Sequence, residues 1–222
     1  MINNIEHYIE HTLLRSDANL NDIYKLIDEA IEYNFFAICI NPYFVKLAKD
    51  YILKNKSDLK ITTVIGFPLG ANLIETKVFE AKKALIDGAD EFDMVMNISA
   101  FKSNKFDVVF NDISSVKEAV GDKVLKVIIE TDLLSKNEII KACKIAIEAK
   151  ANFVKTSTGF IKNGIGATLE NVKIMYDIVK DSGLKVKASG GIKTYDFACD
   201  LINISKAARL GTSSGVNIFK RI

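Results

Sequence analysis

Two hydrophobic patterns alternate along the chain. Short apolar runs rich in β-branched residues, as expected of buried strands, lie at residues 35–40, 60–67, 91–96, 123–130, 153–158, 185–189 and 209–213. Between them apolar residues recur at helical spacing, at residues 21–33, 74–86, 136–149 and 169–180. Ser135 and Thr168 stand where helix N-caps are expected. Successive strands start about 30 residues apart, which is the length of a βαβ unit.

A candidate strand at residues 11–14 brings the number of βα units to eight and predicts one (β/α)8 barrel domain over residues 1–222, with a short helical segment at about 2–8. An open doubly wound sheet is the alternative, and it usually carries a glycine-rich phosphate motif after its first strand. The chain has no such motif. Its glycine-rich turns, at 190–191 and 211–215, follow the last two strands. Barrels often bind phosphate there, so this placement favours the barrel.

Side chains on a strand alternate between its two faces, which predicts what the barrel encloses. In the strand at 91–96, Phe92, Met94 and Met96 form an apolar set that should face the helices, and this turns Asp93 inward. The same alternation turns inward the side chains of Cys39, Lys155 and Lys187.

Lys155 and Lys187 lie on consecutive strands, and neighbouring strands are about 5 Å apart. A single strand lysine is best explained as a solvated strand end or a buried ion pair. Two close ammonium groups are costly to bury unless one loses its proton or carboxylates compensate. The usual functional reason is a lysine nucleophile that a second cation keeps deprotonated for attack on a carbonyl. Asp93 is then either a counter-ion or a proton-transfer group.

Composition narrows the chemistry further. The 30 basic and 28 acidic residues leave a net charge of +2, too small to indicate a partner among nucleic acids or membrane surfaces. The only histidines are His7 and His11, so a multi-histidine zinc site is nearly excluded, and packing roles are expected for both. The arginines are Arg15, Arg209 and Arg221. A phosphate site would therefore use backbone N–H groups or lysines.

The three cysteines are odd in number and widely spaced, which fits neither a disulfide framework nor a CxxC motif. Cys143 and Cys199 lie at apolar helix positions and are expected to pack in the core. The first ten residues show no apolar signal-peptide stretch, and no apolar run approaches the roughly 18 residues of a membrane span. We therefore expect a cytoplasmic protein.

Seven ordered segments resemble the deoxyribose-phosphate aldolases, a class I aldolase family with a (β/α)8 barrel. They lie at residues 39–42 (CINP), 64–70 (VIGFPLG), 88–93 (GADEFD), 126–131 (KVIIET), 153–159 (FVKTSTG), 186–192 (VKASGGI) and 211–215 (GTSSG). The resemblance runs from Ile9 to Gly215. It implies the reversible cleavage of 2-deoxy-D-ribose 5-phosphate into acetaldehyde and D-glyceraldehyde 3-phosphate.

The resemblance also implies residue roles. Lys155 matches the Schiff-base lysine, Lys187 the second lysine that keeps it deprotonated and assists proton transfer, and Asp93 the acid/base aspartate that works through an ordered water. The positions that match substrate or phosphate contacts are Thr12, Cys39, Gly159, Gly190, Gly191, Ser213 and Ser214. No metal and no organic cofactor is implied. Family members are usually dimers or tetramers, so a homodimer or homotetramer is expected.

The chain departs from the family pattern in three places. Glu10 stands where the family usually has aspartate, and it either keeps that role or is a strand-end counter-ion. Phe160 replaces a lysine that longer relatives carry, and the chain ends in Ile222 without a terminal tyrosine.

Lys126 and Glu130 lie on the same face of one strand. They are expected to neutralise each other or else to polarise the substrate pocket.

Two rival functions remain open from the sequence. The first is another Schiff-base sugar-phosphate enzyme, such as a transaldolase-like barrel, although the paired Lys155 and Lys187 argue against it. The second is a catalytically inert barrel that binds sugar phosphates, although the three catalytic matches are intact.

Overall fold

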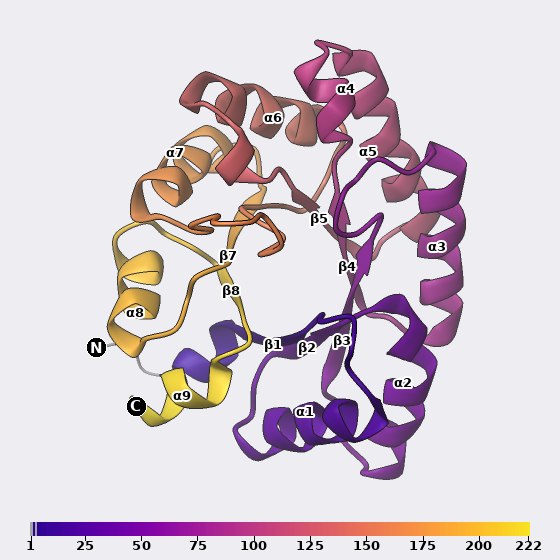
Figure 1. The fold of residues 1–222 in the computed structure, drawn as a ribbon, viewed down its shortest axis with the longest axis vertical. Helices are drawn as coiled ribbons and strands as arrows, with labels where there is room; N and C mark the ends of the chain where they lie inside the picture. The colour runs from indigo at the N-terminus through magenta and orange to yellow at the C-terminus, as the bar shows by residue number, and fades with distance from the viewer. Residues whose placement is uncertain (1, 3) are drawn as a thin grey trace.

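The eight predicted strands form one closed parallel barrel. The computed structural model describes residue 2 and residues 4–222, and in it the strands pair in chain order from β1 to β8, with β8 closing onto β1 (Figure 1). They are β1 (Ile9–Leu13), β2 (Ala37–Ile40), β3 (Lys60–Ile65), β4 (Glu91–Val95), β5 (Val124–Ile128), β6 (Phe153–Lys155), β7 (Lys185–Ser189) and β8 (Arg209–Thr212). The expected (β/α)8 fold is confirmed.

Helices surround the barrel on its outside (Figure 1). The α-helices are α1 (Leu20–Glu32), α2 (Val45–Lys54), α3 (Ile74–Asp87), α4 (Ile98–Lys102), α5 (Phe106–Val120), α6 (Lys136–Glu148), α7 (Leu169–Val179), α8 (Tyr195–Asn203) and α9 (Gly215–Lys220). Three short 3-10 helices are η1 (Ile5–Tyr8), η2 (Pro42–Phe44) and η3 (Thr131–Leu133). Ser135 and Thr168 do cap α6 and α7: their hydroxyls accept the backbone N–H of Glu138 and Asn171.

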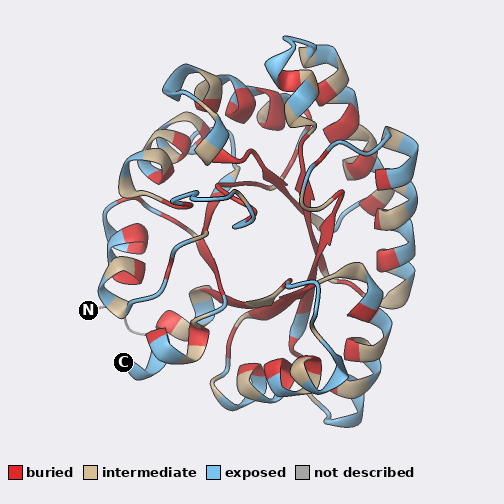
Figure 2. Ribbon diagram, viewed as in Figure 1, coloured by how far each residue is buried: buried red, intermediate tan, exposed pale blue. Residues whose placement is uncertain are grey.

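The main hydrophobic core lies between the strands and the helices. Phe92, Met94, Val154 and Val186 belong to it, together with one face of each surrounding helix. Most strand residues are buried (Figure 2). Because these apolar side chains face outward, alternation leaves the intervening residues of each strand to fill the barrel interior. Cys143 and Cys199 are core residues, as expected.

Several strands end earlier than the apolar runs predict. The run at 123–130 forms a strand only to Ile128, because Glu130 adopts the left-handed conformation (φ 59°), which breaks the extended ladder. The run at 153–158 forms a strand only to Lys155, and residues beyond it begin the turn toward α7. Within the described part of the chain, no helix is long and apolar enough to cross a membrane.

Candidate active site

Asp93 lies at the centre of a buried cluster inside the barrel. Its Oδ2 accepts a hydrogen bond from Lys155 Nζ at 2.8 Å and another from Lys187 Nζ at 2.7 Å. Its Oδ1 accepts a third from Lys126 Nζ at 3.0 Å. Lys155 pairs with Lys187 in the β6–β7 register, and Lys126 pairs with Asp93 in the β4–β5 register. The convergence predicted from strand alternation is therefore present.

A second layer of charge lies beneath this centre. Glu10 forms an ion pair with Lys187, and its Oε1 is 3.4 Å from Lys126 Nζ. Lys126 Nζ is also 2.6 Å from Glu91 Oε2. Arg209 Nη1 completes the cluster at 3.3 Å from Glu10 Oε1. Glu10 is thus a counter-ion to two buried lysines in the middle of the barrel.

Ion pairing overrides the cost of burial at these groups. Burial by itself would raise the pKa of Asp93, but the ammonium groups of Lys126, Lys155 and Lys187 outweigh it and hold that pKa well below its ordinary value. Burial would lower the pKa of Lys187, whereas Asp93 and Glu10 outweigh it and raise that pKa. Lys187 therefore remains a cation next to Lys155.

A cavity of about 490 Å³ opens above Lys155 at the carboxyl end of the strands. Six residues with expected substrate or phosphate roles line it: Thr12, Gly159, Gly190, Gly191, Ser213 and Ser214. Asp93 and Lys187 lie below its floor and are fully buried. Of the three lysines around Asp93, Lys155 is the one that a molecule in this cavity could contact.

The turn after β7 has a shape that requires glycine. Gly190 and Gly191 have φ angles of 86° and 73°, in the left-handed region. A Cβ on Gly191 would lie 2.6 Å from the carbonyl oxygen of Ile165, in the loop between β6 and α7. The two loops are therefore in direct contact, and Gly190 O accepts the backbone N–H of Ala167 at 3.0 Å.

We expect Gly191→Ala to weaken binding of a phosphorylated substrate. The methyl group would push the β6–α7 loop away and strain the left-handed turn, so the backbone N–H groups at this wall would shift. The expected result is a rise in KM of about 10-fold or more with a smaller change in kcat, since misplaced phosphate contacts cost about 1 to 3 kcal/mol. Steady-state kinetics checks this, with Gly183→Ala as the control, because a Cβ at Gly183 meets nothing within 4 Å although its φ is also positive. Equal KM changes in both variants would contradict the expectation.

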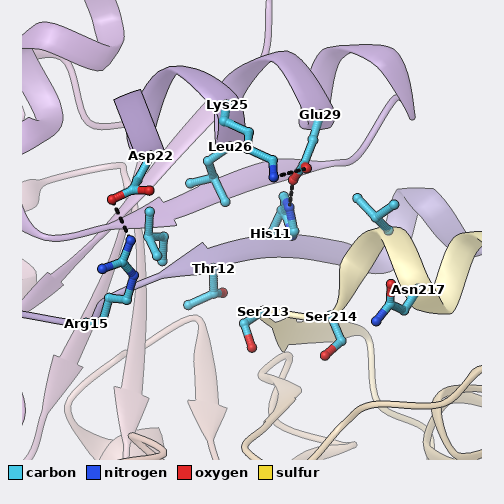
Figure 3. Close-up of a pocket in the computed structure, with 12 residues that line it drawn as sticks. His11, Thr12, Arg15, Asp22, Lys25, Leu26, Glu29, Ser213, Ser214 and Asn217 are labelled. Carbon is cyan, nitrogen blue, oxygen red and sulfur yellow. Dashed lines mark hydrogen bonds and ion pairs between the residues drawn. The ribbon is translucent and has the colours of Figure 1, made fainter. Parts of the chain in front are cut away.

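A second cavity of about 360 Å³ adjoins the first and lies between β1, α1 and the start of α9 (Figure 3). Thr12, Ser213 and Ser214 line both cavities. Arg15 is paired with Asp22 at 2.5 Å, which directs its guanidinium toward α1. His11 Nε2 lies 2.9 Å from Glu29 Oε2, in agreement with a packed rather than a catalytic histidine.

In the described part of the chain the structure lacks the ion pair expected between Lys126 and Glu130, and it buries Cys39 beside the cavity. Lys126 and Glu130 form no ion pair among the described residues: Lys126 contacts Asp93, Glu91 and Glu10, whereas the left-handed turn points the Glu130 carboxylate toward Thr158. Glu130 accepts hydrogen bonds from the N–H and hydroxyl of Thr158. Cys39 is fully buried against Leu14 and Val64 and is not among the residues that line the cavity.

The side chains of Glu10, Cys39 and Asp93 offer donor atoms that lie within 4.8 Å of one another. Both carboxylates are already paired with ammonium groups, and Lys187 contacts both of them. Burial also raises the pKa of the Cys39 thiol, which opposes the thiolate form that binds metals. This donor set therefore fits an ammonium group better than a metal ion.

Comparison with known proteins is consistent with this geometry. The family model described as DeoC/LacD family aldolase matches residues 1–221. The chain belongs to this aldolase family. A deoxyribose-phosphate aldolase of Thermococcus gammatolerans is 54% identical over 216 residues, which cover 96% of this chain and 94% of that relative.

Solved structures of aldolases have the same fold. One described as "QR15, an Aldolase" is 41% identical, with a TM-score of 0.92 over 99% of this aldolase and 96% of that chain. The deoxyribose phosphate aldolase from Aeropyrum pernix, described as having a unique tetrameric structure, is 31% identical, with a TM-score of 0.87 over 97% and 89% of the two chains.

Sequence reasoning assigned no function to Glu91, Arg209 or the contact between Glu130 and Thr158. Glu91 lies two residues before Asp93 on β4, so strand alternation puts both on the same face but does not indicate the partners of Glu91. Arg209 begins β8 and stacks on Phe36, with its Cζ 3.3 Å from the ring centroid. The chain has only three arginines, and this was the one sequence feature that could have drawn attention to Arg209.

Proposed function

We propose that this aldolase reversibly cleaves 2-deoxy-D-ribose 5-phosphate into acetaldehyde and D-glyceraldehyde 3-phosphate through a Schiff base on Lys155. The observation that carries the proposal is the contact of Lys155 and Lys187 with one Asp93 oxygen beneath an open cavity. The identity to deoxyribose-phosphate aldolases over nearly the whole chain supports the same substrate.

In the proposed cycle the Lys155 amine attacks C1 of the open-chain sugar, and loss of water gives an iminium ion. The C2–C3 bond then breaks as the C3 hydroxyl loses its proton: C3 becomes the aldehyde carbon of D-glyceraldehyde 3-phosphate, which leaves, and the bonding electrons pass to the iminium to form an enamine. Protonation of the enamine at C2 and hydrolysis release acetaldehyde and free Lys155. Asp93 and Lys187 hold and exchange protons next to the reacting nitrogen, with a water molecule completing the path to the substrate.

The phosphate is proposed to bind at the wall formed by Gly190, Gly191, Ser213 and Ser214, with Thr12 and Gly159 beside the sugar. Backbone N–H groups and hydroxyls suit this role, since the lysines nearest the reaction centre are already paired with carboxylates. Cys39 is proposed to pack beneath the pocket. We also propose that the protein works in the cytoplasm as a homodimer or homotetramer.

An assay with a substrate panel tests this function. Incubation with 2-deoxy-D-ribose 5-phosphate should release acetaldehyde, which is detected by coupling to alcohol dehydrogenase. The keto-sugar phosphates that serve as donor substrates of transaldolases should not be cleaved. Cleavage of a different sugar phosphate in preference to this one would replace the proposed substrate. Binding without turnover of any panel member would support an inert barrel instead.

Because the iminium acts as the electron sink, we expect EDTA to leave the activity unchanged. The measurement is the cleavage rate before and after dialysis of the aldolase against EDTA. The coupling alcohol dehydrogenase, which can depend on zinc, is kept out of the EDTA treatment. A loss of more than about 10-fold that added metal restores would contradict the proposed mechanism.

A further inference from the structure

Arg209 and Glu91 lie at the amino-terminal end of the barrel strands, away from the cavity. Each is the first residue of its strand, β8 and β4, so both lie at the end opposite the carboxyl-terminal mouth. Arg209 Nη1 is 3.6 Å from Glu91 Oε2 and 3.3 Å from Glu10 Oε1. Its guanidinium stacks on Phe36, and the Phe153 ring lies 5.7 Å from its Cζ. Neither residue lines the substrate cavity.

Ion-pair contacts connect these two residues to the reaction centre without a break. Arg209 contacts Glu10 and Glu91, both of these contact Lys126, and Lys126 and Lys187 contact Asp93. The connected cluster comprises Arg209, Lys126, Lys155, Lys187, Glu10, Glu91 and Asp93. Each of these side chains is at most 11% exposed.

The cluster contains four basic groups and only three carboxylates. Burial destabilises an ammonium group most where the fewest carboxylates contact it. An arginine keeps its proton. Lys126 contacts three carboxylates and Lys187 contacts two, whereas Lys155 contacts only Asp93. Lys155 is therefore the lysine of the cluster whose ammonium form these contacts stabilise least.

We propose that Arg209 and Glu91 are positioning residues that control the protonation of Lys155 from the amino-terminal end of the barrel, with opposite signs. The positive charge of Arg209 favours the neutral amine, and the negative charge of Glu91 favours the ammonium form. The inference rests on the proposed function, because a neutral Lys155 is what a Schiff base requires. The effect is transmitted as charge through Glu10, Lys126 and Asp93, since buried charges are only weakly screened.

Other groups around the lysine pair do not remove this dependence. Thr62 on β3 is uncharged, and burial raises the pKa of the Cys39 thiol on β2, which keeps it neutral. Glu130, after β5, is the remaining acid that acts on Lys155. Its carboxylate is engaged by Thr158, and it is unaltered in the variants below.

The test compares Arg209→Met, Arg209→Lys and Glu91→Gln with the wild-type chain. Removing the Arg209 charge stabilises the Lys155 ammonium, so the acidic limb of the kcat/KM profile should move up by about half a pH unit or more. Removing the Glu91 charge should move the same limb down by a similar amount. Arg209→Lys keeps the charge and should restore most of the wild-type profile.

A second readout is independent of the substrate. Lys155 is labelled with formaldehyde and cyanoborohydride over a range of pH, and its modification is followed by peptide mass mapping. The labelling profiles should shift in the same opposite directions as the kinetic limbs. If Lys155 is labelled in a wild-type protein that cleaves no sugar phosphate, the proposed function is refuted. The influence of Arg209 and Glu91 on the protonation of Lys155 is then still decided by the labelling profiles.

Two outcomes would overturn the inference. One is a shift of both profiles in the same direction for Arg209→Met and Glu91→Gln, which indicates a structural effect. The other is an unchanged limb in both folded variants. If circular dichroism shows that Arg209→Met does not fold, Glu91→Gln decides alone: a downward shift supports the inference, and no shift or an upward shift refutes it.

Discussion

Replacing Lys155 by alanine should lower kcat/KM for 2-deoxy-D-ribose 5-phosphate cleavage by at least about 10³-fold, because the covalent route is lost with the amine. Lys155 is the one lysine of the buried cluster that lines the cavity, and the other lining lysine, Lys193, belongs to the exposed loop after β7 and has no contact with Asp93 among the ion pairs of the described residues. Steady-state kinetics with purified protein measures the effect.

Lys185→Ala is the matched control for this variant. Lys185 is the first residue of the neighbouring strand β7, at the amino-terminal end of the barrel, and its side chain is exposed. The control should keep kcat and KM within about 2-fold of the wild type, as is usual for a surface lysine far from the chemistry. A Lys155→Ala protein that folds and retains more than a tenth of the wild-type activity would contradict the Schiff-base role.

Asp93→Asn should have the second largest effect, and it should lower both activity and stability. The amide keeps the shape of the carboxylate but leaves the ammonium groups of Lys126, Lys155 and Lys187 without their shared counter-charge. Loss of a proton-transfer group typically costs about 10² to 10⁴ in rate. Loss of one partner of a buried ion pair typically costs about 3 to 5 kcal/mol of unfolding free energy.

Kinetics and urea unfolding at neutral pH measure the two effects of Asp93→Asn. The control is Asp58→Asn, since Asp58 is exposed in the connection before β3, and it should change the free energy of unfolding by less than about 0.5 kcal/mol. An Asp93→Asn protein as stable as the wild type would show that the central carboxylate is not needed to hold the lysines.

The stability difference between wild type and Asp93→Asn should depend on pH in a defined direction. The pKa of Asp93 is depressed in the folded state, so its stabilisation is fully present above the unfolded pKa of about 4. It is lost as the pH falls through the depressed folded pKa. Urea midpoints of the two proteins should therefore differ by a constant amount from about pH 5 to 7 and converge below about pH 4. A difference that grows on acidification would contradict this assignment.

Strand alternation predicted the central chemistry because the barrel fold follows from local patterns. Phe92, Met94 and Val154 are apolar and must face the helices, and this alone determines that Asp93 and Lys155 point inward. The closure of the barrel then brings side chains of distant strands together. Their partners also depend on how deep in the barrel each side chain lies, which alternation does not specify.

The remaining features of the site depend on backbone conformation and on depth along the barrel. The left-handed turn at Glu130 reverses the direction that strand alternation assigns to it, so its contact with Thr158 replaced the expected pair with Lys126. Glu10 was left with two interpretations, because only the closed barrel shows that it reaches Lys187 and Lys126. The same holds for Arg209 and Glu91, whose strands are far apart in sequence.

Trapping of the covalent intermediate tests the central claim most directly. The protein is incubated with acetaldehyde and sodium borohydride, digested, and its peptides are mapped by mass spectrometry, with Lys155→Ala treated in parallel. The account predicts one reduced two-carbon adduct on Lys155, formed much faster than on any exposed lysine and absent at that position in the variant. An unmodified Lys155 in protein that cleaves 2-deoxy-D-ribose 5-phosphate, or an adduct on Lys187 in its place, would contradict it.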